Sequence, residues 1–373
     1  MHHPSVRVKV SGLVISCLII LGTAVVSPSS PDAKIKGSLQ SNIAAPKTFF
    51  SIAPIFTSDT PNLRRMSNNG IGAIRIPVSW AELNPEPGVY SWESFDQKVR
   101  DAAAHDLEVR PFLSITPLWL HKDFRAFPVH TTYQIRSWKK FLEKIVNRYR
   151  PQGQFWQENS ELPRRYIRSW QIGNEPNAST FAVSPSASGY GKLLKLSYPV
   201  IKDADENAKV IMAGLYAQYG VGPPVSYTAI RFLDMMYKRY PNLNHYFDAF
   251  ALHPYSKNSN KLRPLLKEVR RALDTRGAQH KPIWLTEMGW GSAYGVGETV
   301  FEKGRKGQAT NLKRAYKLLL KQRRNWNIGQ VTWFSWDDGA ICDFCDSTGL
   351  FDTEGKAKPA WQAFKTIAEK WSL

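Results

Sequence analysis

Residues 170–177 read Trp-Gln-Ile-Gly-Asn-Glu-Pro-Asn, and the rest of the chain can be ordered around this stretch. The apolar run 166–172 predicts a buried strand. Pro176 ends that strand, because proline has no backbone donor for a strand ladder. The carboxylate of Glu175 is therefore left at the carboxyl end of the strand, with the amide of Asn174 beside it.

A second stretch repeats this arrangement. Residues 282–290 read Pro-Ile-Trp-Leu-Thr-Glu-Met-Gly-Trp, so a short apolar strand again leads to a glutamate, Glu287. One such glutamate alone is more often a solvated loop charge or a helix cap. Two of them at two strand ends are what cleavage of a glycosidic bond needs, because one protonates the leaving oxygen while the other attacks or activates water.

The segments around these two motifs alternate between short apolar strands and amphipathic helices, which is typical of parallel βα units. The expected strands are 49–54, 71–77, 108–115, 166–172, 209–215, 247–252, 283–286 and 330–335. The expected helices are 62–69, 92–106, 133–149, 188–207, 230–240, 261–276, 309–325 and 359–370. Eight units of this kind predict an α/β fold, a single (β/α)8 TIM barrel over residues 49–373 without a second domain.

The motifs resemble those of a known group of enzymes. Residues 75–80, Arg-Ile-Pro-Val-Ser-Trp, are similar to family 5 glycoside hydrolases and their neighbours. The Phe-Trp-x-Glu-Asn loop at 155–159, followed by residues 170–177, resembles bacterial family 39-type enzymes. Both belong to the clan A retaining glycoside hydrolases, which are built on (β/α)8 barrels. The resemblance covers residues 49–373, and its motifs are specific for the clan rather than for one family.

The resemblance implies roles for the polar residues near the strand ends. Glu175 would be the acid and base, and Glu287 the nucleophile. Arg75 and Tyr255 would keep Glu287 ionised, because a cation and a hydrogen-bond donor both favour a carboxylate. Asn174 would donate to the 2-hydroxyl of the sugar. The alternatives are a structural ion pair for Arg75, core packing for Tyr255 and a loop-capping amide for Asn174.

Three further candidates have two interpretations each. His253 follows the strand at 247–252 and either orients a glutamate, touches the sugar or is a satisfied core histidine. Trp119 and Trp336, the latter with Trp333 as an alternative, either stack on sugar rings or fill the core. Gly173 stands where several relatives carry a bulkier residue, so the resemblance does not define the pocket floor near the acid.

The amino-terminal residues predict export. Arg7 and Lys9 precede an apolar run at 10–26, and small residues follow, so residues 1–27 read as a signal peptide. The run is near the lower limit for a membrane span, so an uncleaved membrane anchor is the alternative. Residues 28–48 lack periodicity and read as a flexible linker. A secreted or extracytoplasmic location follows from this interpretation.

The chain is strongly basic. Its 373 residues carry 50 Lys and Arg against 31 Asp and Glu, a formal charge of +19. These cations are dispersed along the chain rather than interleaved with aromatic residues, so we expect no nucleic-acid partner. A cationic surface is suited to acidic cell-wall glycans, although it equally serves solubility.

Cys342 and Cys345 are close in sequence within the loop after the last strand. In an exported protein this spacing favours a small-loop disulfide. A metal site would need further ligands, and a redox motif would need a different fold context. No phosphate-binding loop, Ser-His-Asp arrangement or His-Glu-x-x-His motif is present, so we expect no metal and no organic cofactor.

The leading hypothesis is a secreted retaining β-glycoside hydrolase that acts alone as a monomer on an oligo- or polysaccharide. Two alternatives remain: a transglycosylase that remodels a cell-surface polysaccharide with the same residues, and a catalytically inactive glycan-binding barrel. Long loops at 150–165 and 293–306 suggest a walled cleft. This favours internal cleavage of a β-linked polysaccharide over the release of single sugars.

Overall fold

The fold is taken from a computed structural model that describes residues 44–54, 60–217, 226–294, 300–339 and 345–373. The chain divides into two units, Met1–Asn42 and Ile43–Leu373, and only the second is described. The predicted signal peptide at 1–27 therefore lies outside the described residues. So does Cys342, and its bridge to Cys345 stays a prediction.

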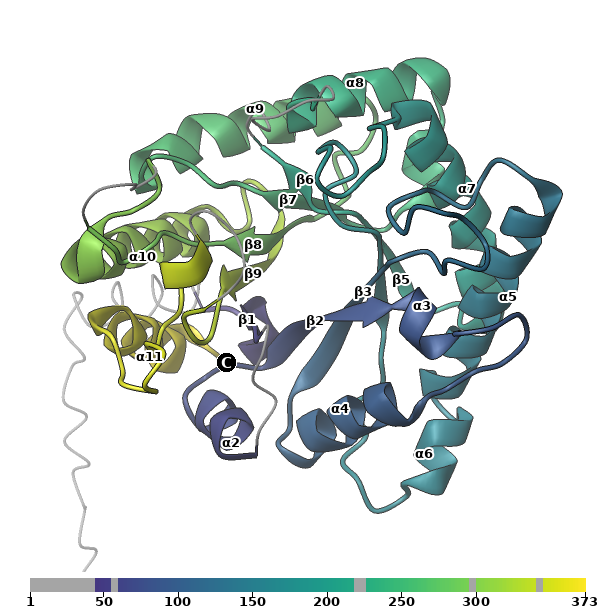
Figure 1. Ribbon diagram of the computed structural model, residues 1–373. Helices are drawn as coiled ribbons and strands as arrows, with labels where there is room; N and C mark the ends of the chain where they lie inside the picture. The colour runs from purple at the N-terminus through teal and green to yellow at the C-terminus, as the bar shows by residue number, and fades with distance from the viewer. Residues whose placement is uncertain (1–43, 55–59, 218–225, 295–299, 340–344) are drawn as a thin grey trace, which may run out of the picture. The chain divides into compact units, whose positions relative to one another are not determined.

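The described unit is organised around one parallel sheet (Figure 1). Its strands lie in the order β5-β4-β3-β2-β1-β9-β8-β7-β6. They are β1 Phe50–Ala53, β2 Ala73–Ser79, β3 Glu108–Ser114, β4 Ser169–Ile172, β5 Lys209–Met212, β6 Leu215–Tyr216, β7 Phe250–His253, β8 Ile283–Met288 and β9 Ile328–Phe334.

The two ends of this sheet are pieces of one strand. Only Ala213 and Gly214 separate β5 from β6, and Ile211 of β5 forms a parallel bridge to Ala249 next to β7. The sheet therefore closes into a ring of eight strands, one of them broken. The predicted (β/α)8 barrel is confirmed, and the predicted single strand 209–215 is interrupted near its carboxyl end.

Helices surround the ring of strands in Figure 1. They are α2 Thr60–Asn68, α3 Trp80–Leu83, α4 Glu93–Ala104, α5 Thr132–Tyr149, α6 Gln154–Glu158, α7 Ala187–Ala204, α8 Ala229–Arg239, α9 Leu262–Asp274, α10 Gly304–Gln322 and α11 Pro359–Trp371. The eight predicted helices are found with shifted ends, whereas the short α3 and α6 were not expected. Among the described residues, no helix has the length and apolarity needed to cross a bilayer.

The helices form where local sequence and packing agree. At the start of α5, the Thr131 hydroxyl accepts from the Gln134 amide at 3.1 Å, and the Gln134 side chain accepts from the Thr131 amide at 3.3 Å. This capping box satisfies two donors that the helix leaves without partners. In α9, Leu266, Val269 and Leu273 are fully buried at helical spacing. Each such side chain contributes about 1.5–3 kcal/mol by leaving water.

The barrel interior is packed with polar side chains rather than hollow. Arg110 donates to Gln330, whose amide donates to Thr332 at 2.6 Å. The Arg110 guanidinium also lies 4.8 Å from the ring centre of Trp284. These buried groups satisfy one another, and they form the floor under the site described below.

The barrel unit begins earlier than predicted. The linker was expected to run to residue 48, but Ala45 is fully buried. Its amide donates to Trp371 at 2.8 Å, and its carbonyl accepts from Leu373 at 2.8 Å. Ala45 therefore packs against the end of the chain, and the barrel unit includes residues that were assigned to the linker.

The loop at 150–165 lies at the wrong end of the barrel for the role expected of it. It connects α5 to the amino end of β4 and contains α6. Arg165 pairs with Asp106, which lies two residues before the start of β3. In a parallel barrel these ends lie opposite the carboxyl ends of the strands. The expectation that this loop helps to wall a substrate cleft is therefore wrong.

Candidate active site

The turn after β4 presents Glu175 to the barrel mouth. Gly173 has φ +82° and Glu175 has φ +39°, so the chain turns through two left-handed residues. A Cβ on Gly173 would meet only ordinary contacts, 3.7 Å to Tyr190 and 3.9 Å to Ala213. The positive φ, which disfavours residues with a Cβ, is the conformational reason for a glycine at this position.

The end of β8 brings two neighbouring side chains to the same place. Successive residues of a strand normally point to opposite faces. The pairing of β8 with β9 shifts between Leu285 and Met288, and such an irregularity re-aims side chains. Thr286 and Glu287 consequently both reach the central cluster. Glu287 lies within the strand, which runs to Met288, and not just after it as predicted.

Arg75, on β2, links the groups of the site. Its guanidinium donates to Glu287 Oε1 at 2.8 Å and to Asn174 Oδ1 at 2.7 Å. Its Nε donates to Gln171 at 3.2 Å. The side chain is buried, and its guanidinium carbon lies 4.0 Å from the ring centre of Phe112. Arg75 thus holds one positive charge at a fixed place between the strand ends.

Glu287 is surrounded by groups that favour its charged form. Its second oxygen, Oε2, accepts from the Tyr255 hydroxyl at 2.9 Å. Burial raises the pKa of Glu287, and the charge of Arg75 together with the Tyr255 and Arg75 hydrogen bonds opposes that rise. Both carboxylate oxygens have donors, so Glu287 is the better place for the negative charge.

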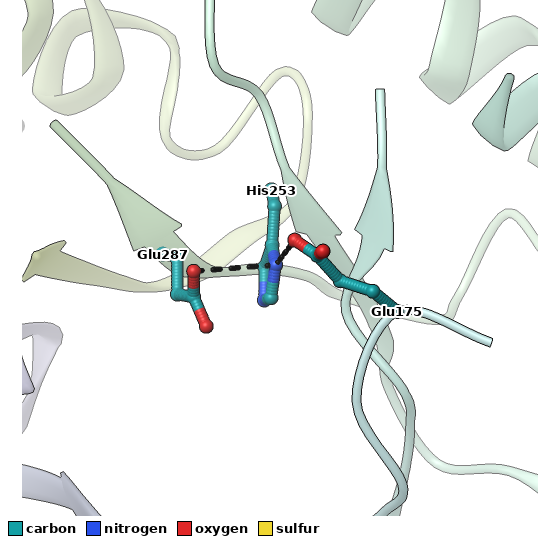
Figure 2. A group of neighbouring side chains, drawn as sticks. All are labelled: Glu175, His253 and Glu287. Atoms are coloured by element: carbon teal, nitrogen blue, oxygen red, sulfur yellow. Dashed lines mark hydrogen bonds and ion pairs between the residues drawn. The ribbon is translucent and has the colours of Figure 1, made fainter. Parts of the chain in front are cut away.

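Glu175 lies in a different environment (Figure 2). Its Oε1 is 2.5 Å from Nδ1 of His253, and that same nitrogen is 3.5 Å from Oε2 of Glu287. Burial and the neighbouring charge of Glu287 raise the pKa of Glu175 well above its usual value, against the charge of Arg75. A shared proton therefore resides on Glu175, as two close carboxyls cannot both ionise cheaply.

His253 is a neutral partner in this cluster. Burial, and then the charge of Arg75, lower its pKa well below the usual value. Its Nε2 lies 3.0 Å from the Thr286 hydroxyl, which can donate or accept. When Glu175 is protonated, it donates to Nδ1 and Nε2–H donates to Thr286. When Glu175 is ionised, Nδ1–H donates to it and Thr286 donates to Nε2.

The break between β5 and β6 makes room for this histidine. A Cβ on Gly214 would lie 2.0 Å from Nε2 of His253. No side chain other than hydrogen fits there without moving the ring. The Gly214 carbonyl also accepts from the Glu175 amide at 3.2 Å, so one residue accommodates the histidine and positions the glutamate.

The two carboxylates are close. One side-chain ligand atom from each of Glu175, His253 and Glu287 lies within 4.8 Å of the others. These three groups have the chemistry of metal ligands. The Arg75 guanidinium, 2.8 Å from Glu287, would repel a cation there. The donor set is therefore better suited to handling a proton than to holding a metal ion.

The two predicted tryptophans lie outside this cluster. Trp336 is fully buried, with its ring 4.6 Å from Phe351 and 5.2 Å from Trp361. It fills the core, so the prediction that it stacks on a sugar is wrong. Trp119 is half-buried, donates to the Asn84 carbonyl at 2.9 Å and packs on Trp80.

The structure adds four residues that sequence reasoning missed. Gln171 is a partner of Arg75 and Thr286 of His253. The ring of Tyr216 lies 6.1 Å from Tyr255, and that of Phe334, the last residue of β9, lies 6.4 Å from Tyr255. Phe334 is the aromatic residue that faces the site in place of Trp336. Its position as the last residue of the final strand could have identified Phe334 as a site residue from the sequence.

Comparisons with known proteins identify a family and a shared fold. Residues 173–364 match the family described as glycosyl hydrolase catalytic core. This region begins at the turn after β4 and contains both glutamates. No curated protein is significantly similar in sequence.

Solved structures share the fold at low sequence identity. A family 39 glycoside hydrolase from Bacteroides cellulosilyticus WH2 aligns with a TM-score of 0.63 and 19% identity, over 88% of this chain and 64% of that chain. The chain thus spans less than two thirds of that protein. A monomeric beta-xylosidase from Caulobacter crescentus CB15 aligns with a TM-score of 0.60 and 16% identity, over 87% of this chain and 68% of that chain. Xylanase 10B from Thermotoga maritima aligns with a TM-score of 0.61 and 16% identity, over 89% of this chain and 97% of that chain.

The family match extends over more than half of the chain, and the barrel and the paired buried glutamates are consistent with it. The chain therefore belongs to the glycosyl hydrolase catalytic core family and is a glycosidase.

Proposed function

We propose that the chain is a retaining β-glycoside hydrolase that cleaves a β-linked glycan by double displacement. The observation that carries this proposal is the separation of Glu175 and Glu287, which have oxygens within 4.8 Å. Retaining enzymes hold their carboxyls about 5–5.5 Å apart, whereas inverting enzymes leave about 6.5–9.5 Å for a water molecule. The short separation supports direct attack by one carboxylate.

The first step uses the different protonation of the two glutamates. Glu287, ionised beside Arg75 and Tyr255, attacks the anomeric carbon and forms a covalent bond to it. Glu175 gives its proton to the glycosidic oxygen, which leaves with the bonding electron pair as an alcohol. The free Nδ2 of Asn174, whose Oδ1 is held by Arg75, is suited to donate to the 2-hydroxyl of the sugar.

The second step reverses these roles. Glu175 is now a carboxylate and accepts a proton from water while the water oxygen attacks the anomeric carbon. The bond to Glu287 breaks, and its electron pair returns to the carboxylate. Two inversions retain the anomeric configuration. Through this exchange the His253–Thr286 pair can satisfy either protonation state of Glu175.

Secretion is part of the proposal and rests on the sequence of residues 1–27. Fractionation of the host cell checks it, and full-length protein found free in the cytosol would contradict it. The transglycosylase alternative uses the same first step. It requires an acceptor alcohol in place of water and therefore predicts transfer products at high acceptor concentration.

The central test is the configuration of the first product. The purified protein is assayed on p-nitrophenyl β-glycosides of xylose, glucose, mannose and galactose, and proton NMR follows the cleaved sugar. A retaining enzyme releases the β-anomer first. Initial release of the α-anomer would show inversion, and no hydrolysis of these or of any longer glycan would favour the glycan-binding alternative.

A matched pair of variants makes this assay specific. Glu287→Gln removes the attacking carboxylate while keeping the side-chain size, and we expect it to be inactive. Glu82→Gln is the control, because Glu82 is an exposed glutamate in α3, directly after β2 at the same end of the barrel. Equal activities of the two variants would contradict the assignment.

A further inference from the structure

A pocket of about 440 Å³ opens beside the candidate active site, over the carboxyl ends of β2, β3 and β4. Gly173 and Asn174 belong to its wall, and so does Phe112, whose ring lies 4.0 Å from the Arg75 guanidinium carbon. The pocket therefore borders the reaction centre. A group attached to a sugar that Asn174 holds can reach it.

The lining of this pocket is mainly apolar. Its inner wall is formed by the side chains of Trp80, Leu113, Phe127, Pro128, Trp138 and Leu193. Its mouth carries Ile115, Phe124 and Phe181, which remain 42%, 50% and 44% exposed. Phe124 and Phe181 are the only strongly exposed phenylalanines among the described residues. Exposed apolar side chains that gather at one place mark a binding surface.

Most polar side chains of the lining already form hydrogen bonds within the protein. The Thr116 hydroxyl donates to the Ala126 carbonyl at 2.7 Å. Arg125 binds both oxygens of Asp123, at 3.0 Å and 2.8 Å. Within the described part of the lining, this leaves the hydroxyls of Ser114 and Thr180 and the Nδ2 of Asn174 without a protein partner, since the Asn174 Oδ1 is bound by Arg75.

A sugar ring placed in this pocket would lose more hydrogen-bonding free energy with water than it gained from the protein. Each of its hydroxyls would give up water, and an unpaired buried hydroxyl costs about 1–3 kcal/mol. The few remaining polar groups cannot replace that water. The composition is instead that of a site for an apolar group, with a small number of polar contacts at one side.

The walls of the pocket are held in place before any ligand binds. Arg125 donates to the Ser179 carbonyl at 3.2 Å and so joins the loop after β3 to the loop after β4. The Thr116 amide donates to the Phe124 carbonyl at 2.8 Å. Ile115 has φ +60°, a conformation that β-branched residues rarely adopt and that concentrates at functional sites.

We propose that this pocket binds an apolar group, an alkyl chain or an aromatic ring, that is covalently attached to the glycoside substrate. The proposal rests on the glycosidase function proposed above. The group has two chemical sources. It is either the aglycone that leaves with the glycosidic oxygen or an ether or ester substituent on the sugar that Asn174 contacts.

Two substrate series test the proposal and separate these sources. The first is a set of n-alkyl β-glycosides, ethyl to octyl, of the sugar that the nitrophenyl assay identifies. The second is a set of p-nitrophenyl glycosides of that sugar with 3-O-acyl chains of the same lengths. In the series that uses the pocket, we expect kcat/KM to rise about fourfold per methylene until the pocket is full. A flat dependence in both series would overturn the proposal.

Variants at the mouth connect this dependence to the pocket. Thr180→Trp narrows the entrance and should abolish the rise with chain length. Phe181→Ser should weaken the effect of the longest chain roughly tenfold. Leu118→Ala is the control, because Leu118 is an exposed apolar residue of the loop after β3, the loop that carries Phe124, and does not line the pocket. An equal effect of Leu118→Ala and Phe181→Ser would contradict the assignment.

A binding measurement separates failure of this proposal from failure of the proposed function. The neutral fluorophore N-phenyl-1-naphthylamine needs no glycosidic bond, and we expect its fluorescence to rise with wild type and not with Thr180→Trp. If the fluorophore binds but no glycoside is cleaved, the glycosidase function fails and the apolar site stands. If glycosides are cleaved but Thr180→Trp binds the fluorophore like wild type, the pocket proposal fails. Circular dichroism verifies the fold of each variant.

Discussion

The ends of β4 and β8 look alike in sequence and differ in their surroundings. Each presents a buried glutamate to the same space, yet Glu287 accepts from Arg75 at 2.8 Å and from Tyr255 at 2.9 Å. Glu175 instead lies 2.5 Å from the neutral imidazole of His253. The same residue type is thereby held as a charge at one strand end and as an acid at the other, because neighbours determine the protonation state.

The largest effect should come from replacing the charged member of the pair. Glu287→Gly should lower turnover by more than the roughly 10²–10⁴-fold that proton transfer contributes, since the attacking atom itself is lost. Azide enters the space left behind and should restore cleavage of a 2,4-dinitrophenyl β-glycoside, with an α-glycosyl azide as product. Glu287→Gln is the control, because its amide fills that space and should prevent rescue. A β-glycosyl azide from Glu287→Gly would break the assignment.

Replacing the acid member should give a loss that depends on the leaving group. Glu175→Ala should cleave alkyl β-glycosides about 10²–10⁴-fold more slowly. It should still react rapidly in the first step with a 2,4-dinitrophenyl leaving group, which needs no proton. Azide should then give a β-glycosyl azide. Equal losses on both leaving groups, measured by stopped-flow kinetics, would show that Glu175 is not the proton donor.

The donor to Glu287 can be removed without touching either carboxyl. In Tyr255→Phe the hydrogen bond that lowers the pKa of Glu287 is lost, so that pKa should rise. The acidic limb of the kcat/KM profile should move to higher pH, with a loss of about 10²–10³-fold at the optimum, as for a missing charge-stabilising donor. Tyr316→Phe, which alters a buried tyrosine packed against Phe50, is the control. An unchanged acidic limb in Tyr255→Phe would remove Tyr255 from this role.

The smallest effect should come from a change next to His253, the partner of Glu175. Thr286→Val removes the group that accepts from Nε2–H of His253, and a buried donor without a partner costs about 1–3 kcal/mol. His253 should then prefer the form with its proton on Nδ1, which stabilises ionised Glu175. The basic limb should move to lower pH, with roughly tenfold lower activity at most. Thr332→Val, at a buried threonine deeper in the barrel, should leave that limb in place.

Local sequence patterns predicted most of the fold. Apolar runs of strand length alternate with helical periodicity, and both periods are visible in neighbouring residues. The same patterns located Asn174, Glu175, Tyr255 and Glu287 at or next to strand ends. Arg75 was also expected at a strand end but is the third residue of β2, and it joins the others through its long side chain. Residues at the carboxyl ends of parallel strands must meet, so this part of the site could be predicted.

One error arose where the outcome depended on distant neighbours, and the other arose because the direction of a strand was not considered. Trp336 looks like a sugar platform from its place after the last strand, but Phe351 and Trp361 from later in the chain enclose it. The loop at 150–165 looked like a cleft wall because of its length. The direction of β4 shows at which end of the barrel this loop lies. A loop that leads into the amino end of a strand lies opposite the carboxyl ends.

The sequence by itself determined the barrel and the pair of glutamates, because strand and helix periods and strand-end motifs are local properties of the chain. The resemblance predicted which glutamate carries the proton, but only the tertiary structure supplies the physical reason. Arg75 and Glu287 are 212 residues apart, and Glu175 and His253 are 78 apart. Protonation depends on burial and on charges within a few ångströms, and those neighbours exist only once the barrel has closed.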